Sequence, residues 1–307
     1  MRIFTLTLNP AYDVHVHAKE FIPFHENIAT VLSREAGGKG VNISRALLRA
    51  HTESTAVVLL GAENSGEFRR ELENTGLSTL LWEVPGRIRE NITVHCDNAP
   101  ETRISFTGFS ADDSILDEIF SHIRPDPDTV ITMTGRIAQG MTLARVKEFL
   151  KVAANLGARI VIDSRSFSLC DLEEVRPWLI KPNQEEISAY CGTPVTDRKT
   201  ALAKARELAR LGIGNVLVSL GEQGALLVQG EQVFFARAPR LRAVSTIGAG
   251  DSSVAGFLAA TAQALPPEVC LTWAVAFGSA ACLTPGTQPP EEAAIRELLP
   301  QISCERL

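Results

Sequence analysis

The sequence lacks the surplus of positive charge that nucleic-acid-binding proteins carry. Its 307 residues include 36 acidic and 30 basic side chains, which give a formal net charge of −6. Because affinity for nucleic acid comes mainly from neutralising phosphates, this balance argues against such a partner. Small molecules are the expected partners instead.

Long apolar runs are also missing. No stretch approaches the ~20 apolar residues that a membrane helix needs. The first eight residues, Met1 to Leu8, alternate like a strand and contain neither the apolar core nor the cleavage site of a secretion signal. We therefore expect a cytoplasmic protein.

Cysteine is sparse, and no two cysteines form a C-x-x-C pair. The six cysteines, at positions 96, 170, 191, 270, 282 and 304, are too scattered for a disulfide framework and are expected to be reduced thiols. His15 and His17 could share one face of a strand, but no third ligand lies nearby to support a metal site.

Two common phosphate-binding motifs are absent. Ser253 stands where the third glycine of G-x-G-x-x-G would follow Gly248 and Gly250. The Gly38-Lys39 pair lacks the earlier glycine of a Walker A motif and is followed by another glycine in place of Ser or Thr. Any phosphate site must therefore be built in another way.

Residues 242–264 offer such a way. A β-branched run stops at Gly248 and Gly250, and a small, apolar helical pattern begins behind Asp251, which predicts a strand, a glycine turn and a helix. Free amides and the helix dipole favour an anion at this turn. Asp251 could serve merely as an N-cap, but a carboxylate beside an anion site also suits proton removal from an attacking hydroxyl, and we favour that interpretation.

The rest of the chain alternates strands with helices. Strands are expected near 54–60, 129–133, 158–162, 178–180 and 215–219, and helices near 66–74, 112–123, 142–155, 184–190 and 198–211. This order predicts a mostly parallel sheet with helices on both faces, in one domain spanning residues 1–307. Short strands near 12–32 and a hairpin at 91–107, turning at Asn98, do not fit the alternation and are assigned to a small separate sheet.

Polar residues gather where the predicted strands end. They are Asn9, Asp13, Gly135, Asp163, Lys181, Asn183 and the segment Ser219 to Gly224. Ligands of open parallel sheets sit outside the carboxyl ends of the strands. Together with the glycine turn before Asp251, these residues predict one pocket.

Several segments, in this order, carry a family resemblance. They are Leu8-Asn-Pro-Ala-Tyr-Asp13, Ala36-Gly-Gly-Lys-Gly-Val-Asn42, Lys181-Pro-Asn-Gln-Glu-Glu186, Ser219-Leu-Gly-Glu-Gln-Gly-Ala225 and Ser245-Thr-Ile-Gly-Ala-Gly-Asp-Ser252. The sequence resembles the ribokinase-type sugar kinases of the PfkB family, and within them the phosphosugar branch. The resemblance implies a ribokinase-like α/β fold whose small sheet, from about 10–34 and 87–108, forms a lid over the sugar and a homodimer contact.

The resemblance also implies roles for individual residues. Asp251 matches the catalytic base, and Gly248, Ala249 and Gly250 match the anion hole. Sugar hydroxyls would be held by Asp13, Gly38 and Asn42, and Mg²⁺ with its waters by Asn183 and Glu186. The ATP phosphates would contact Lys181, Asn183, Ser219, Gly221 and Gly224.

A phosphosugar needs cations at the end away from Asp251. Arg89 and Arg103 match arginines of the phosphosugar branch, and Lys39 lies in the adjacent glycine turn. Arg136 is a weaker candidate, because it replaces the small serine of the family's Gly-Ser-Leu-Pro stretch. The family's Thr-Arg-x-Asn motif is also altered, to Ile88-Arg-Glu-Asn91, so the identity of the sugar stays open.

We therefore expect an ATP-dependent, Mg²⁺-requiring kinase of a ketohexose monophosphate. Fructose 1-phosphate, converted to fructose 1,6-bisphosphate, is the first candidate substrate, and tagatose 6-phosphate and fructose 6-phosphate are the alternatives. A sugar-phosphate sensor without turnover is a further alternative, which the retention of Asp251 and its glycine turn disfavours.

Overall fold

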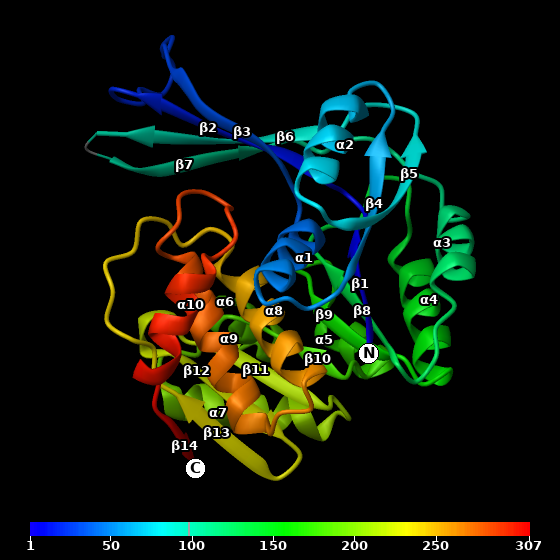
Figure 1. Ribbon diagram of the computed structural model, residues 1–307, viewed down its shortest axis with the longest axis vertical. Coiled ribbons are helices and arrows are strands. Elements are labelled where there is room, and N and C mark those ends of the chain that lie inside the picture. Colours follow the sequence, from blue (N-terminus) through cyan, green and yellow to red (C-terminus); the bar gives the residue numbers. More distant parts are fainter. Residues whose placement is uncertain (98) are drawn as a thin grey trace.

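A ten-stranded sheet forms the centre of the computed structural model, which describes residues 1–97 and 99–307 (Figure 1). Its strand order is β14-β13-β12-β11-β10-β9-β8-β1-β4-β5. From β5 to β11 every neighbouring pair is parallel, whereas the pairs from β11 to β14 are antiparallel. The strands span Arg2–Thr7 (β1), Thr55–Gly61 (β4), Ser78–Val84 (β5), Thr129–Thr134 (β8), Arg159–Asp163 (β9), Leu179–Ile180 (β10), Asn215–Ser219 (β11), Ala225–Gln229 (β12), Gln232–Ala236 (β13) and Cys304–Arg306 (β14).

Helices cover both faces of this sheet. They span Lys39–Arg49 (α1), Ser65–Asn74 (α2), Ile115–Ile123 (α3), Leu143–Asn155 (α4), Leu169–Val175 (α5), Gln184–Cys191 (α6), Arg198–Arg210 (α7), Ala249–Ala262 (α8), Pro267–Ala281 (α9) and Glu292–Leu298 (α10). The predicted α/β class, with a mostly parallel sheet between two helical layers, is confirmed. Among the described residues, no helix is both long and apolar enough to cross a membrane.

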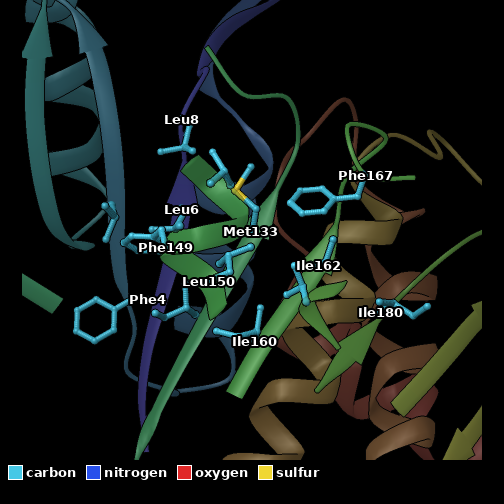
Figure 2. Packing of buried hydrophobic residues seen from close by; sticks show 14 of the residues in the cluster. Phe4, Leu6, Leu8, Met133, Phe149, Leu150, Ile160, Ile162, Phe167 and Ile180 are labelled. Atoms are coloured by element: carbon cyan, nitrogen blue, oxygen red, sulfur yellow. The ribbon is translucent and has the colours of Figure 1, made fainter. Parts of the chain in front are cut away.

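The strands carry apolar side chains on both faces, and successive residues pack into two separate cores. In β8, Val130 packs into the core beneath α1, α8, α9 and α10, whereas Ile131 and Met133 pack into the core beneath α2 to α7. Figure 2 shows part of the second core, where Phe149 and Leu150 of α4 approach the strands. Burial on both faces explains why β4 and β9 are near-continuous apolar runs, whereas β8 also buries Thr129, Thr132 and Thr134 among its apolar residues.

A separate four-stranded sheet stands at one end of the main body (Figure 1). Its order is β3-β2-β6-β7, formed by Ala11–Ala18 (β2), Thr30–Gly37 (β3), Arg89–Cys96 (β6) and Ala99–Ser105 (β7). The hairpin predicted at 91–107 is therefore present, although Asn98 in its predicted turn lies outside the described residues. The predicted small sheet is confirmed as a structure, and its function as a lid remains a proposal.

Three local features were not predicted. The segment Glu35 to Gly37 continues β3, because it pairs with β2, and α1 starts only after Gly38, whose φ of 131° is not helical. Helix α5 was not predicted, although Ser168 and Asp171 form a capping box at its start. Strand β14 was missed because it is only three residues long.

Candidate active site

The glycine turn at the start of α8 is built differently from the prediction. Residues 242–247 do not form a strand; instead, Val244 N and Ser245 N donate to the carbonyl oxygen of Cys282, at the end of α9. Gly248 is the N-cap residue and has a φ of 81°, a left-handed conformation that favours glycine. Gly250 already lies within the first turn of the helix. The first-turn amides of α8 lack the partners that an earlier helical turn would provide, and of these Ala249 N donates to the carbonyl oxygen of Thr246 at 3.4 Å.

Asp251 projects from this first turn and is 6% exposed. The N-cap position belongs to Gly248, and no side chain caps the helix, so the capping interpretation of Asp251 is excluded. Asn42 Nδ2, from α1, donates a 3.0 Å hydrogen bond to Asp251 Oδ2. Lys39 Nζ, also from α1, lies 3.7 Å from Asp251 Oδ1.

A second buried carboxylate, Asp163 at the end of β9, lies between two lysines. Lys39 Nζ is 2.7 Å from its Oδ2 and Lys181 Nζ is 3.6 Å from its Oδ1. Lys39 therefore bridges the two aspartates rather than facing the arginines with which it was grouped in the sequence. Gly135, after β8, donates its N–H to the Asp163 carbonyl oxygen and completes this rim.

The pKa values of Asp251 and Asp163 are shifted in opposite directions. Burial raises the pKa of Asp251, and the charge of Asp163 raises it further, against the opposing effects of Lys39 and Asn42. Burial would also raise the pKa of Asp163, but Lys181 and Lys39 outweigh it and hold that pKa below its ordinary value. Asp163 is thus the fixed anion, and Asp251 is the carboxylate with the greater affinity for a proton.

Asp13, on β2, is held by two neighbouring strands of the small sheet. Asn91 Nδ2 donates to Asp13 Oδ1 at 2.9 Å, and Arg103 Nη2 donates to the same oxygen at 3.1 Å. A side chain at Gly37 would collide with Asp13 Oδ2, which requires glycine there. Asn91 was not among the predicted site residues, although its place two residues after Arg89 in an Arg-x-Asn sequence could have revealed it.

Arginines gather beside Asp13. Arg89 donates to the backbone oxygens of Phe106 and Asn9, at 3.1 and 3.3 Å, and its Nε has no hydrogen-bond partner among the described residues. Burial lowers the pKa of Arg89, and the charges of Arg136 and Arg103 lower it further. Arg89 is thus repelled by two neighbouring cations on a partly buried surface, which favours binding of an anion there.

The residues predicted to contact ATP follow β10 and β11. Ser219 N donates to the Pro182 carbonyl oxygen, and Asn183 forms an isolated parallel bridge with Ser219. Gly221 and Gly224 lie in and after the short 3₁₀ turn that joins β11 to β12. The segments of Lys181, Asn183 and Ser219 are therefore brought together, as expected from their positions after adjacent strands.

The donor set near α6 limits how Mg²⁺ could bind. Asn183 Oδ1 accepts from Glu186 N at 2.8 Å, Glu186 Oε2 accepts from Asn183 N at 3.1 Å, and Glu186 Oε1 accepts from Arg165 at 3.1 Å. No group of three or more His, Cys, Asp or Glu among the described residues could hold a metal ion. These residues do not form a protein cage, but they fit Mg²⁺ that keeps its waters and binds mainly through substrate phosphates.

Comparison with known proteins finds similar chains along nearly the whole sequence. The family described as pfkB family carbohydrate kinase matches residues 15–294. The chain is 31% identical to the 1-phosphofructokinase of Bacillus subtilis, over 99% of this chain and 100% of the relative. It is 28% identical to the 1-phosphofructokinase of Vibrio cholerae, over 100% and 97% of the two chains. The structure of phosphofructokinase-2 from Escherichia coli in complex with substrates and products superposes with a TM-score of 0.90 at 26% identity, covering 98% and 99% of the two chains.

Proposed function

The chain belongs to the pfkB family of carbohydrate kinases, and from this premise we propose that it transfers the γ-phosphoryl group of ATP to fructose 1-phosphate. The product is fructose 1,6-bisphosphate. The relatives named 1-phosphofructokinase support this substrate, because they match the chain over nearly its whole length. Tagatose 6-phosphate and fructose 6-phosphate are the less favoured substrates.

The buried carboxylate of Asp251, in the first turn of α8, is the observation that carries the catalytic part of the proposal. Asp251 accepts the proton of the attacking primary hydroxyl, and its raised pKa makes it a stronger base than an ordinary aspartate. The amides at Gly248, Ala249 and Gly250 stabilise the negative charge of the phosphoryl group in transfer. Lys39, 3.7 Å from Asp251, opposes the rise in this pKa and so favours the ionised form that accepts the proton.

The arginine cluster supports a phosphorylated sugar as substrate. Arg89, Arg103 and Arg136 bind the phosphate that the sugar already carries, and the repulsion of Arg89 by the other two is relieved when the dianion arrives. Asp13, Gly38 and Asn42 bind the sugar hydroxyls. The buried Oδ1 of Asn42, which has no partner among the described residues, is suited to accept a hydrogen bond from such a hydroxyl.

The nucleotide lies along the segments that follow β10 and β11. Lys181, Ser219, Gly221 and Gly224 contact its phosphates. Asn183 and Glu186 hold Mg²⁺ through its water shell, and the chemistry that the ion supplies there is neutralisation of charge on those phosphates.

The small sheet, residues 10–34 and 87–108, acts as the lid and as a homodimer contact. Several apolar side chains are exposed there: Val31, Leu32 and Ile104 on its strands, and Phe24 and Ile28 in the segment that joins β2 to β3. Exposed apolar residues on a sheet with open edges favour pairing with another chain. A second copy of this chain presents the same surface and can bury it symmetrically.

A substrate panel tests the proposal. ADP release is followed with fructose 1-phosphate, fructose 6-phosphate, tagatose 6-phosphate and free fructose, and the phosphorylated product is identified by NMR. We expect the highest kcat/KM with fructose 1-phosphate and little turnover of fructose. Equal activity on fructose and its phosphates would refute the phosphosugar assignment, whereas binding without any ADP release would favour the sensor.

A further inference from the structure

Among the described residues, no side-chain hydrogen bond or ion pair joins helix α2 to the proposed catalytic residues, yet several bonds join it to the base of the small sheet. It lies between that sheet and the edge of the main sheet formed by β4 and β5 (Figure 1). The first bond involves Tyr12 of β2. Its hydroxyl donates to the carbonyl oxygen of Asn64 at 2.8 Å and accepts from the N–H of Phe68 at 2.9 Å. The ring of Tyr12 also packs edge-on against Phe68.

The second bond uses the N-cap residue of α2. Asn64 does not cap its own helix. Instead, Asn64 Oδ1 accepts from the N–H of Ile88 at 2.7 Å, and Asn64 Nδ2 donates to the carbonyl oxygen of Ile88 at 3.0 Å. Both backbone groups of the residue that precedes β6 are therefore fixed by one side chain, in the way that a neighbouring strand would fix them.

The third set of bonds holds both backbone groups of Ala36, near the end of β3. Because β3 is an edge strand of the small sheet, its outward backbone groups have no strand partner. Glu71 Oε2 accepts from the Ala36 N–H at 2.7 Å, and Arg45 Nη1 donates to the Ala36 carbonyl oxygen at 2.7 Å. Arg45 and Glu71 also form a 2.8 Å ion pair with each other.

Each of the three residues held by these bonds directly precedes part of the proposed phosphosugar site. Tyr12 is followed by Asp13, Ala36 by Gly37 and Gly38, and Ile88 by Arg89. These segments depend on one another, since a side chain at Gly37 would collide with Asp13. We propose that α2 is the element that positions the phosphosugar site, with Asn64 and Glu71 as its positioning residues. This inference rests on the proposed function.

The simpler explanation is that these bonds merely satisfy buried backbone groups. Ala36 is fully buried, and its polar groups would cost free energy without partners. That role predicts lower stability on mutation and no preference between substrates. The positioning role predicts a loss confined to the phosphosugar, because none of the residues bonded to α2 lies in the segments assigned to ATP.

The test uses Asn64→Ala and Glu71→Ala, with Glu73→Gln as the matched control. Glu73 is on the same helix, is exposed and forms no side-chain hydrogen bond or ion pair with the described residues. Couplings of about 0.5–2 kcal/mol correspond to about a 2- to 30-fold rise in KM for fructose 1-phosphate. We expect KM for ATP to change less than twofold, and the control to match the unchanged protein in both.

Conservative variants separate positioning from folding. Asn64→Asp keeps the acceptor for Ile88 N–H but loses the donor, and Glu71→Gln keeps one acceptor oxygen, so both should give intermediate KM values. Tyr12→Phe keeps the ring packing and removes only the hydroxyl, so it serves if the alanine variants fail to fold. Thermal unfolding is measured for every variant.

Variants that lose stability but keep both KM values, or that raise both KM values equally, would overturn the inference. Failure of the proposed function would look different, because the unchanged protein itself would then not phosphorylate fructose 1-phosphate. If it acts on another phosphosugar, the same comparison is made with that substrate, and an unaltered KM would again reject the positioning role of α2.

Discussion

The side-chain amide of Asn42 donates a 3.0 Å hydrogen bond to the carboxylate of Asp251, across 209 positions of sequence. The bond joins the first turns of α1 and α8, which pack against each other under the same face of the main sheet. It fixes the orientation of the Asn42 amide and leaves its Oδ1 buried and free among the described residues. The Gly-Gly-Lys-Gly-Val-Asn segment and the Gly-Ala-Gly-Asp turn are therefore two halves of one site.

Replacing the proposed base tests the centre of this site. Asp251→Asn removes a proton acceptor and keeps the size of the side chain, so we expect kcat to fall by ~10²–10⁴, the range for loss of a general base. Nucleotide affinity, measured by titration calorimetry, should be nearly unchanged. A variant with near-normal kcat would show that Asp251 is not the base.

The same variant makes a prediction about stability and pH. Burial raises the pKa of Asp251 above its ordinary value of 3.8, so the unfolded chain ionises first as the pH rises, and the folded protein loses stability until the pH reaches the raised pKa, above which the loss is constant. Asparagine is always neutral. The melting temperature of Asp251→Asn, relative to that of the unchanged protein, should therefore rise as the pH increases from about 4 toward the raised pKa of Asp251 and stay constant above it. A difference that is constant with pH would contradict the sign of this shift.

Lys39 offers an independent test of the charge network. It lies between Asp163 and Asp251, and its charge lowers the pKa of both carboxyls. In Lys39→Met this opposing charge is lost, so the pKa of Asp251 should rise further. The acid limb of the kcat profile should then move to higher pH. If the acid limb is unchanged and only KM for the phosphosugar rises, Lys39 has the phosphate-binding role expected from the sequence.

Much of this arrangement was predictable because its signals are local. The glycine turn and the strand ends each lie within a few residues of sequence, and they predicted that Asp251, Asp163 and Lys181 share one rim, whereas Arg89 was expected only from the resemblance to the phosphosugar branch. The network of Lys39 with Asp163 could not be predicted in the same way, because it links residues 124 positions apart through side-chain geometry.

Other features could not be predicted from the sequence because they depend on contacts between distant segments. The β-branched run at 242–247 has strand propensity but no neighbouring strand to pair with, and its amides bond to the end of α9 instead. Asn64 and Glu71 belong to no motif. Their importance is visible only once the backbone groups of Ile88 and Ala36 are seen to lack other partners.

The arginine cluster predicts how the phosphosugar is recognised. Arg89→Ala or Arg103→Ala removes a charge-assisted contact worth about 1.5–3 kcal/mol, so KM for fructose 1-phosphate should rise by at least about tenfold while KM for ATP stays nearly constant. Arg87→Ala is the matched control, since Arg87 is close in sequence but 69% exposed and 4.0 Å from Glu63. Wild-type behaviour of both arginine variants would reopen the choice among free sugars.

The exposed apolar residues of the small sheet predict a dimer. Val31, on the edge strand β3, is 62% exposed, and burying it against a second copy would remove apolar surface from water. A charge there must be desolvated on association, so Val31→Lys should shift the protein toward monomers in light scattering. Val152→Lys is the control, because Val152 lies on α4, away from the small sheet, and is 43% exposed.

If the lid also needs its partner to close over the sugar, the Val31 variant should lose affinity for fructose 1-phosphate as it dissociates, and raising the protein concentration should restore it. An unchanged protein that is monomeric at assay concentration and fully active would rule out this dimer.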